Sequence, residues 1–410
     1  MISREEILNA AREQDLTPNV VEKDYVLGWL LAGIAQHTLL SGWVFKGGTC
    51  LKKCFFETYR FSEDLDFTVP KGFIYDANAY RGALVECAER ISAETGIELL
   101  ESGIEVRESH DKEGRTTFFG KISYRGPLMP QASTPPRIKI DLTQHEVIVE
   151  NPEKRPIRHF YSDAPNPPFS ILCYTVNEIL AEKTPALFER QARARDVYDV
   201  VNISRNHREE IDPQKALAVL RKKFEFKALT LPSLVGFTSA LDFTTLQANW
   251  DQQLRHQLPV LPPAQSYFDE LKESALLWIE ARVIVERLPR VTVGEGEVAV
   301  PRAAFPQMEL ARFGKAALSG GGSFGSYAAL EKIRYAARNR LCAEIHYQGV
   351  LRIAEPYSLR TRGTGNLLVY VHEISRGGVR TETTKAYMVA QIQGVRITES
   401  EFHPRYAVEL

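Results

Sequence analysis

A pair of aspartates separated by one leucine, Asp64 and Asp66, gives the clearest chemical signal in this sequence. Side chains alternate between the two faces of a β-strand, so both carboxylates point one way while Leu65 and Phe67 face a core. Two like charges held this close repel each other unless a cation neutralises them. A site made only of carboxylates favours Mg²⁺, with Mn²⁺ as a substitute. The pair therefore predicts a divalent-metal site.

A glycine turn precedes this pair along the chain. Gly47, Gly48 and Thr49 follow a short apolar strand and open a helix. Backbone N–H groups at such a turn and helix start are a ready place for phosphate. Lys46 flanks the turn and is a second candidate for contact with phosphate. The sequence thus predicts a nucleotide-phosphate site beside the metal site.

The longer string from Phe45 to Phe67 resembles a known family. The glycine turn followed by Asp-x-Asp is similar to the signature of polymerase β-like nucleotidyltransferases, and the whole string resembles the AbiEii/AbiGii toxin branch. The resemblance covers roughly the first two-thirds of the chain. It implies a Mg²⁺-dependent enzyme that transfers NMP from an NTP to a hydroxyl acceptor, with RNA, such as a tRNA 3′ end, expected. It also implies a toxin of a toxin–antitoxin or phage-defence system, restrained by a cognate antitoxin.

A third carboxylate is expected from a neighbouring strand, as in the nucleotidyltransferase pattern. Residues 137–142 alternate apolar with charged side chains, and Asp141 lies on the charged side. Asp141 would complete the metal site and could take the proton from an attacking hydroxyl. The alternative is a half-buried edge strand whose charged face is merely solvated.

Further candidates come from helical segments. Lys183 stands in a Glu-x-x-x-Glu-Lys context that resembles a family motif, which implies contact with the triphosphate. Composition alone favours an exposed lysine paired with Glu178 or Glu182. Asp196 lies in a string that matches the family signature Arg-Asp-x-Tyr-Asp, and it could position Lys183, the base or the sugar, or pair with a nearby arginine. For residues 22–24, Glu-Lys-Asp, a solvated helix face is favoured over direct catalysis.

The elements that must hold these residues predict an α+β protein. The patterns over residues 1–168 favour N-terminal helices followed by strands, and those over 169–288 favour a helical lobe. The family resemblance implies that the strands form a nucleotidyltransferase-like mixed sheet and that the helical lobe completes the active site. After the Asp-x-Asp strand, the pattern favours a helix over 80–95. It then favours strands at 97–106, 118–124, 137–142 and 146–149, followed by a long loop over 151–168.

The last part of the chain reads as a separate domain. A linker is expected over 289–326, and residues 327–410 resemble the WYL domain, a small Sm-like β-barrel, although Asn366-Leu367-Leu368 stands where Trp-Tyr-Leu is expected. Its basic residues suggest a nucleic-acid or nucleotide patch, with a docking module of merely solvated arginines as the alternative. The candidates are Arg352, Arg360, Arg362, Arg380 and Arg405.

Composition narrows the classes of function. A net charge of −1 over 410 residues argues against a generally basic nucleic-acid coat. The cysteine pattern, without Cys-x-x-Cys, and the absence of an apolar segment of membrane-spanning length predict a cytoplasmic protein with no membrane contact. No Gly-x-x-x-x-Gly-Lys loop is present, which disfavours a P-loop NTPase. The remaining alternatives are a non-catalytic nucleotide-sensing or nucleic-acid-binding regulator and a protein AMP-transferase.

Overall fold

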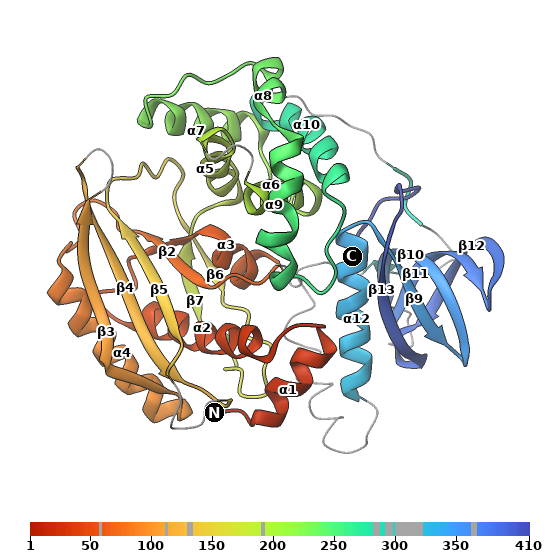
Figure 1. The fold of residues 1–410 in the computed structure, drawn as a ribbon, viewed down its shortest axis with the longest axis horizontal. Coiled ribbons are helices and arrows are strands. Elements are labelled where there is room, and N and C mark those ends of the chain that lie inside the picture. Colours follow the sequence, from red (N-terminus) through yellow and green to blue (C-terminus); the bar gives the residue numbers. More distant parts are fainter. Residues whose placement is uncertain are drawn as a thin grey trace. The chain divides into compact units, whose positions relative to one another are not determined.

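The computed structural model describes residues 1–56, 60–110, 114–128, 134–189, 193–281, 288–291, 298–299, 323–361 and 367–410. Contacts divide the chain into two compact units, and each is described by itself (Figure 1). The first unit comprises Met1–Pro259 and Gln265–Val283, and the second comprises Val260–Ala264 and Ile284–Leu410. Within the described residues, no helix has the length and apolar character needed to cross a bilayer.

Two helices open the first unit. Helix α1 (Arg4–Glu13) begins where the Ser3 hydroxyl accepts a hydrogen bond of 3.1 Å from the Glu6 N–H, a normal N-cap. Helix α2 (Pro18–Gln36) has proline at its first position, where the missing N–H costs nothing. Most of α2 is buried, because apolar residues surround it on several sides rather than on a single stripe.

A seven-stranded mixed sheet forms the centre of the first unit, in the order β3-β4-β5-β2-β1-β7-β6. Strand β2 pairs in parallel with β5 and antiparallel with β1. Figure 1 shows helix α4 (Ala77–Thr95) behind β3, β4 and β5, whose other face is turned to the viewer. The strands are β1 (Val44–Lys46), β2 (Asp64–Thr68), β3 (Glu98–His110), β4 (Thr116–Arg125), β5 (Arg137–Thr143), β6 (Glu153–Pro156) and β7 (Ser170–Cys173).

Strands were predicted at 97–106, 118–124 and 137–142, and β3, β4 and β5 confirm them. The strand predicted at 146–149 is wrong, because Glu146 lies in a bend and turns its carboxylate toward Lys46 instead of joining the sheet. Strand β6 lies inside the segment expected to be a long loop. Between β1 and β2, the helix α3 (Gly47–Cys50) continues into a π-helical turn, Leu51–Phe55.

The remainder of the first unit is helical, as predicted. Helices α6 and α10 are joined by the stacked rings of Tyr198 and Tyr267, whose centroids lie 5.3 Å apart. The Asn202 amide also donates to the Tyr267 hydroxyl, so a buried polar contact supports the same packing. The helices are α5 (Val176–Glu189), α6 (Ala194–Asn206), α7 (Pro213–Phe226), α8 (Leu234–Ala240), α9 (Phe243–Leu254) and α10 (Ala264–Ile279).

The second unit contains helix α12 (Ser323–Arg338) and an antiparallel sheet in the order β12-β11-β10-β9-β13, with β8 paired to β10. Among the described strands β12 and β13 do not pair, so the sheet is not closed and the expected Sm-like barrel is not confirmed. The linker expected over 289–326 lies largely outside the described residues. The strands are β8 (Val298–Ala299), β9 (Leu341–Tyr347), β10 (Val350–Thr361), β11 (Leu367–Arg376), β12 (Val379–Met388) and β13 (Ile392–Glu401).

Candidate active site

The Asp-x-Asp pair lies on β2, next to a third acid on β5. Leu65 and Phe67 are fully buried, whereas Asp64 and Asp66 lie on the opposite face and are only partly covered. The parallel pairing of β2 with β5 sets Asp66 opposite Asp141. Residues in register point to the same face of a sheet. The structure therefore brings all three predicted acids onto one face of two adjacent strands, and we call them the acid row.

The carboxylates of the acid row are held at an electrostatic cost. Burial, together with the charges of Asp141, Glu182 and Asp64, raises the pKa of Asp66 to about 7 against the opposing effect of Lys46. Burial and then Asp64 raise the pKa of Asp141, while Lys139 and Lys46 oppose that rise. Like charges in a partly desolvated site favour protonation unless a cation is bound. The acid row thus has the electrostatics of a cation site.

The donor chemistry fits a hard divalent cation, but the side-chain oxygens are spaced widely. The three acids do not all have oxygens within 4.8 Å of one another; among the described residues only Cys50, Cys54 and Cys173 form a group that close, and they are buried. Mg²⁺ keeps several water ligands and is commonly held by one or two carboxylates together with substrate phosphates. The spacing of the acid row is compatible with that mode of binding, and the metal-ligand roles stay predictions.

The glycine turn is fixed against the acid row. Gly47 has a φ of +77°, and a Cβ atom there would lie 2.2 Å from Oδ2 of Asp66. A side chain at this position would therefore be strained by the backbone and would also collide with the carboxylate. The Thr49 hydroxyl donates to the Asp64 carbonyl oxygen at 2.5 Å, so it ties the turn to β2. This contact leaves the turn's backbone, rather than the Thr49 hydroxyl, as the part suited to phosphate.

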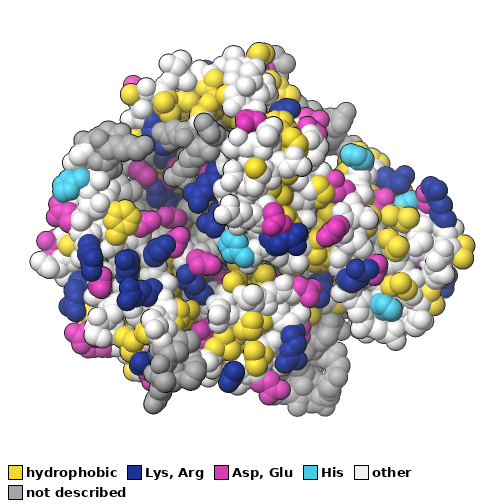
Figure 2. Space-filling model, in the orientation of Figure 1, with side chains coloured by type: hydrophobic (Ala, Val, Ile, Leu, Met, Phe, Trp, Pro, Cys, Tyr) yellow, Lys and Arg dark blue, Asp and Glu magenta, His cyan; other side chains and the backbone are white. Residues whose placement is uncertain are grey.

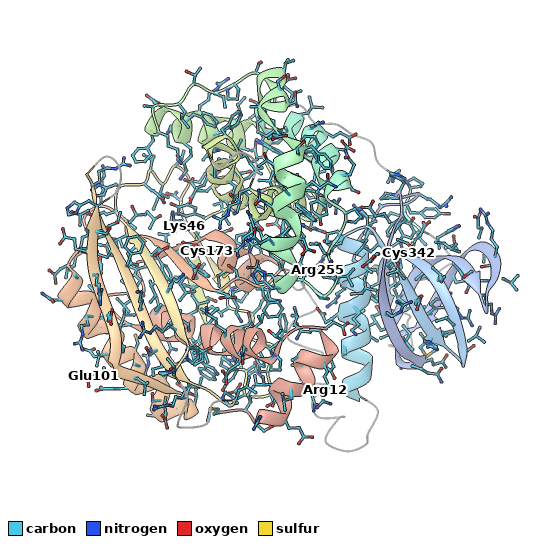
Figure 3. The ribbon with its side chains drawn as sticks, in the orientation of Figure 1. Arg12, Lys46, Glu101, Cys173, Arg255 and Cys342 are labelled. Carbon is cyan, nitrogen blue, oxygen red and sulfur yellow. The ribbon has the colours of Figure 1, made fainter. Side chains whose placement is uncertain are left out.

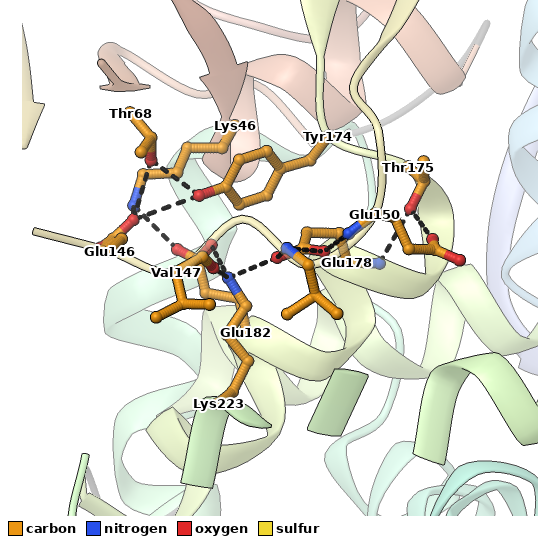
Figure 4. A network of polar contacts seen from close by, with 11 residues as sticks. Lys46, Thr68, Glu146, Val147, Glu150, Tyr174, Thr175, Glu178, Glu182 and Lys223 are labelled. Carbon is orange, nitrogen blue, oxygen red and sulfur yellow. Dashed lines mark hydrogen bonds and ion pairs between the residues drawn. The ribbon is translucent and has the colours of Figure 1, made fainter. Parts of the chain in front are cut away.

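Lys46 lies beside the acid row, in register with Asp66 on the neighbouring strand β1. It ends β1, close to Cys173 on the neighbouring strand β7 (Figure 3). Its buried ammonium donates to Glu146 and, at 3.0 Å, to Glu182 (Figure 4). Despite burial, these carboxylates raise the pKa of Lys46 well above its ordinary value. The predicted phosphate contact by Lys46 stays untested, but this geometry favours a charge-balancing role beside the acids.

The same polar network continues into the helices. Lys223 on α7 lies 2.6 Å from Glu178 on α5, and both side chains are buried. Glu178 also accepts from the backbone N–H groups of Val149 and Glu150 (Figure 4). The pairing of Lys183 with Glu178 or Glu182, which composition alone favoured, is therefore wrong, because Glu178 pairs with Lys223 and Glu182 with Lys46.

Lys183 instead belongs to a buried cluster with Asp196, Asp199 and Arg60, which we call the ion cluster. The Lys183 ammonium lies 3.2 Å from Oδ1 of Asp196 and 2.6 Å from Oδ2 of Asp199. Arg60 donates to both oxygens of Asp199 at 2.7 Å. The two cations hold the pKa of Asp199 well below its usual range despite complete burial. The structure thus brings the predicted residues Lys183 and Asp196 together.

Sequence reasoning missed Arg60 and Asp199 as members of this cluster. Both stand inside the strings that resemble the family, but they lie 139 residues apart, so one sequence does not reveal the pairing. A Cβ atom on Gly48 would lie 2.4 Å from a guanidinium nitrogen of Arg60. Arg60 therefore packs against the glycine turn while its guanidinium holds α6 through Asp199. The second glycine of the motif makes room for this arginine.

The solvated helix face expected at residues 22–24 is wrong. Glu22 and Asp24 are buried on α2. Asp24 accepts from Lys53 at 2.7 Å and from the Tyr161 hydroxyl at 3.0 Å. Glu22 accepts from the backbone N–H of Leu128 at 2.5 Å. These acids fasten α2 to the segments around it.

The arginines proposed for a nucleic-acid patch occupy different environments within the second unit. Arg352 is buried and lies 2.9 Å from Glu373, and buried Arg360 donates to the Val291 carbonyl at 2.7 Å. Arg380 is exposed and pairs with Glu382, and Arg405 lies 3.3 Å from Glu355. Arg362 lies outside the described residues. A surface patch made by all these arginines is not formed, and the WYL-like assignment of residues 327–410 stays a prediction.

The comparisons with known proteins bear on the first unit. The family described as nucleotidyl transferase AbiEii toxin, type IV TA system, matches residues 29–274, which is more than half of the chain. No match is found among the curated proteins. Among solved structures, the chain is similar to MenT4, a nucleotidyltransferase toxin from Mycobacterium tuberculosis H37Rv, at 18% identity over 69% of this chain and 91% of that one, with a TM-score of 0.43. The matched range contains the glycine turn, the acid row and the ion cluster, and the chain belongs to the AbiEii family of nucleotidyltransferase toxins.

Proposed function

We propose that this nucleotidyltransferase is Mg²⁺-dependent and transfers NMP from an NTP to a hydroxyl of RNA, such as a tRNA 3′ end. The observation that carries the proposal is the register of Asp66 with Asp141, with Asp64 on the same face. Carboxylates so arranged, with the pKa values of Asp66 and Asp141 raised, suit a divalent cation that also binds triphosphate oxygens. The toxin family supports transfer from an NTP; the RNA acceptor is our own extension.

Asp64, Asp66 and Asp141 would hold Mg²⁺, or Mn²⁺ in its place, and the bound ion would supply positive charge to the triphosphate. Asp141 would accept the proton of the acceptor hydroxyl, a task that a raised pKa favours. The hydroxyl oxygen forms a bond to the α-phosphorus as the bond to pyrophosphate breaks. The backbone of Gly47, Gly48 and Thr49 would receive phosphate oxygens.

Lys183 would steady the leaving pyrophosphate. Burial lowers its pKa, but Asp199 and Asp196 outweigh that effect and raise the pKa above the ordinary value, so Lys183 keeps its proton near neutral pH. Asp196 would act as a positioning residue, because it contacts the ammonium of Lys183 and limits its rotamers. We further propose that the enzyme works in the cytoplasm, where a cognate antitoxin restrains it, and that phage defence is its setting.

A labelling experiment tests this proposal. Purified full-length protein is incubated with each α-³²P-labelled NTP, Mg²⁺ and total RNA, and the products are separated by size and class. We expect label in RNA, lost with Asp66→Asn and kept with Lys154→Gln, which alters an exposed lysine on β6 at the far edge of the sheet. Label on protein alone would replace the RNA acceptor by a protein AMP-transferase reaction. No label in RNA, protein or small molecules would overturn the proposed reaction.

A further inference from the structure

The open face of β3, β4 and β5 carries basic side chains beside the acid row. Lys121 on β4 lies opposite Lys139 on β5, and Lys139 lies opposite Asp64. Arg137, two residues before Lys139 on the same strand, points to the same face. Figure 2 shows Lys and Arg side chains gathered over this part of the sheet, on the face turned to the viewer. The basic residues therefore lie next to the acid row, on the same face of the sheet.

These basic side chains make few ion pairs with carboxylates of the described residues. Within the described part of the chain, no carboxylate lies at ion-pair distance from Lys121, Arg137 or Lys139. On β3, Arg107 is exposed and pairs with its neighbour Glu105 at 2.8 Å, an exposed contact that holds the charge weakly. A run of cations, most of which lack an ion-pair partner among the described residues, is suited to an anionic partner larger than the nucleotide.

An exposed aromatic ring stands among these cations. Phe119 on β4 lies opposite Asp141 on one side and Arg107 on the other, and it is 46% exposed. The preceding residue, Phe118, faces the opposite side of the sheet and packs against Tyr75 with ring centroids 4.5 Å apart. The apolar layer beneath the sheet is thus filled without Phe119, whose ring is presented beside the acid row. Aromatic rings flanked by basic side chains bind single-stranded nucleic acid by stacking and phosphate contact.

The order of the strands separates two sides of the site. The glycine turn follows β1, on one side of β2, whereas β5, β4 and β3 follow in order on the other side. A nucleotide whose phosphates meet the glycine turn would occupy the β1 side of the acid row. The acceptor, which is the second reactant, must reach the same acids. On the β5 side of the acid row it would meet the basic side chains and the exposed ring of Phe119.

We propose that Arg107, Phe119, Lys121, Arg137 and Lys139 form an acceptor face that binds the single-stranded end of the acceptor nucleic acid. The inference rests on the proposed function and deepens it by naming the surface that presents the acceptor hydroxyl. Phe119 stacks on a base near the reacting end, and the lysines and arginines contact the phosphates that follow. Asp141, in register with Phe119, lies where the terminal hydroxyl arrives.

Binding of a fluorescein-labelled, single-stranded 12-nucleotide RNA to the full-length protein, followed by fluorescence anisotropy between 50 and 200 mM salt, tests the acceptor face. Phe119→Ala should weaken binding about tenfold at every salt concentration, because stacking is uncharged. The double variant Lys121→Gln/Arg137→Gln should weaken binding and lower the slope of log Kd against log salt by about two. Lys139 is left unchanged because its charge also acts on Asp141. Lys154→Gln on the far edge strand is the matched control and should bind like the wild type.

Kinetics with saturating NTP separate this inference from the proposed function. If the wild type labels RNA, the acceptor-face variants should raise the KM for RNA and leave the KM for NTP unchanged. The inference fails if folded variants, checked by circular dichroism, bind RNA with wild-type affinity and salt slope, or if Phe119→Ala raises only the KM for NTP. Should the double variant misfold, Lys121→Gln alone is expected to lower the salt slope by about one. A wild type that binds the oligonucleotide but labels no RNA would defeat the proposed function while leaving the acceptor face standing.

Discussion

The acid row and the ion cluster are both built from aspartates that approach one another, yet their charges are balanced in opposite ways. In the acid row, burial and like charges raise the pKa of Asp66 to about 7. In the ion cluster, Arg60 and Lys183 hold the pKa of the fully buried Asp199 well below its usual range. The difference separates a site prepared to receive positive charge from a site that already contains it.

Their locations explain this division of tasks. The ion cluster joins Arg60, which precedes β2, to Lys183 on α5 and Asp199 on α6, so its contacts fix the helices against the sheet. The acid row lies on strands and is partly covered, and Lys46 beside it on β1 offsets only part of the rise in the pKa of Asp66. A buried ion pair whose hydrogen bonds are all made holds its two elements in one arrangement. Carboxylates without enough positive charge nearby repel one another, and a bound cation relieves that repulsion.

The largest effect should come from Asp66→Asn. This nearly isosteric change removes a charge from the acid row, and we expect nucleotide transfer to fall about a thousandfold or more, because the carboxylate would hold the metal used by the reaction. Initial rates with labelled NTP and RNA measure the loss. Glu101→Gln, on the exposed part of β3, is the control and should retain normal rates. A rate within tenfold of the wild type would remove Asp66 from the catalytic site.

The ion cluster should respond in stability. Asp199→Ala leaves Arg60 and Lys183 buried without their shared acid, and breaking a buried pair in this way costs about 3–5 kcal/mol. Urea denaturation of the full-length protein, followed by circular dichroism, measures the change in the free energy of unfolding. The control, Asp251→Ala, breaks an exposed pair with Arg255 and should cost less than about 1 kcal/mol. Equal costs for the two variants would mean that the ion cluster does not hold the helices.

The two regions also differ in how far the sequence could predict them. Asp64, Asp66 and Asp141 could be assigned to one face because alternation along a strand is a local property, and the order of strands along the chain suggested a neighbouring position for Asp141. The position of Glu146 could not be predicted, because the apolar residues around it follow a pattern typical of a strand. Its carboxylate instead accepts a hydrogen bond from Lys46, 100 residues earlier in the chain. The burial of Asp24 depends likewise on Lys53 and Tyr161, which only the folded chain brings close.

The pH dependence of stability offers a finer comparison. An unfolded aspartate loses its proton near pH 3.9, whereas Asp66 in the folded, metal-free protein keeps it to about pH 7. The free energy of unfolding therefore falls as pH rises between these values, and Asp66→Asn removes that fall. In EDTA, the Tm of the variant should exceed that of the wild type by a margin that grows from pH 5 to pH 7 and then levels off.

The ion cluster should behave in the opposite manner in the same experiment. The lowered pKa of Asp199 means that its contribution to stability is complete above the unfolded pKa and is lost only as pH falls below it. Asp199→Asn should therefore lower the Tm by the same amount at pH 5 and at pH 8. A Tm difference for Asp66→Asn that does not change with pH would mean that the acid row carries no uncompensated charge.

The smallest effect, and the sharpest test of the charge balance, concerns Lys46. Its cation lowers the pKa values of Asp66 and Asp141 but also opposes the binding of a second cation nearby. Lys46→Met should therefore favour Mn²⁺ binding more at pH 8, where a larger share of the acids is ionised, than at pH 6, where protons now compete better. A rise of about one unit in the pKa of Asp66, from about 7, would change the ratio of the affinities at pH 8 and pH 6 about fivefold. Calorimetric titration of both proteins measures the two affinities. If Lys46→Met changed both affinities in the same direction and by the same factor, Lys46 would act through packing alone and not through the ionisation of the acids.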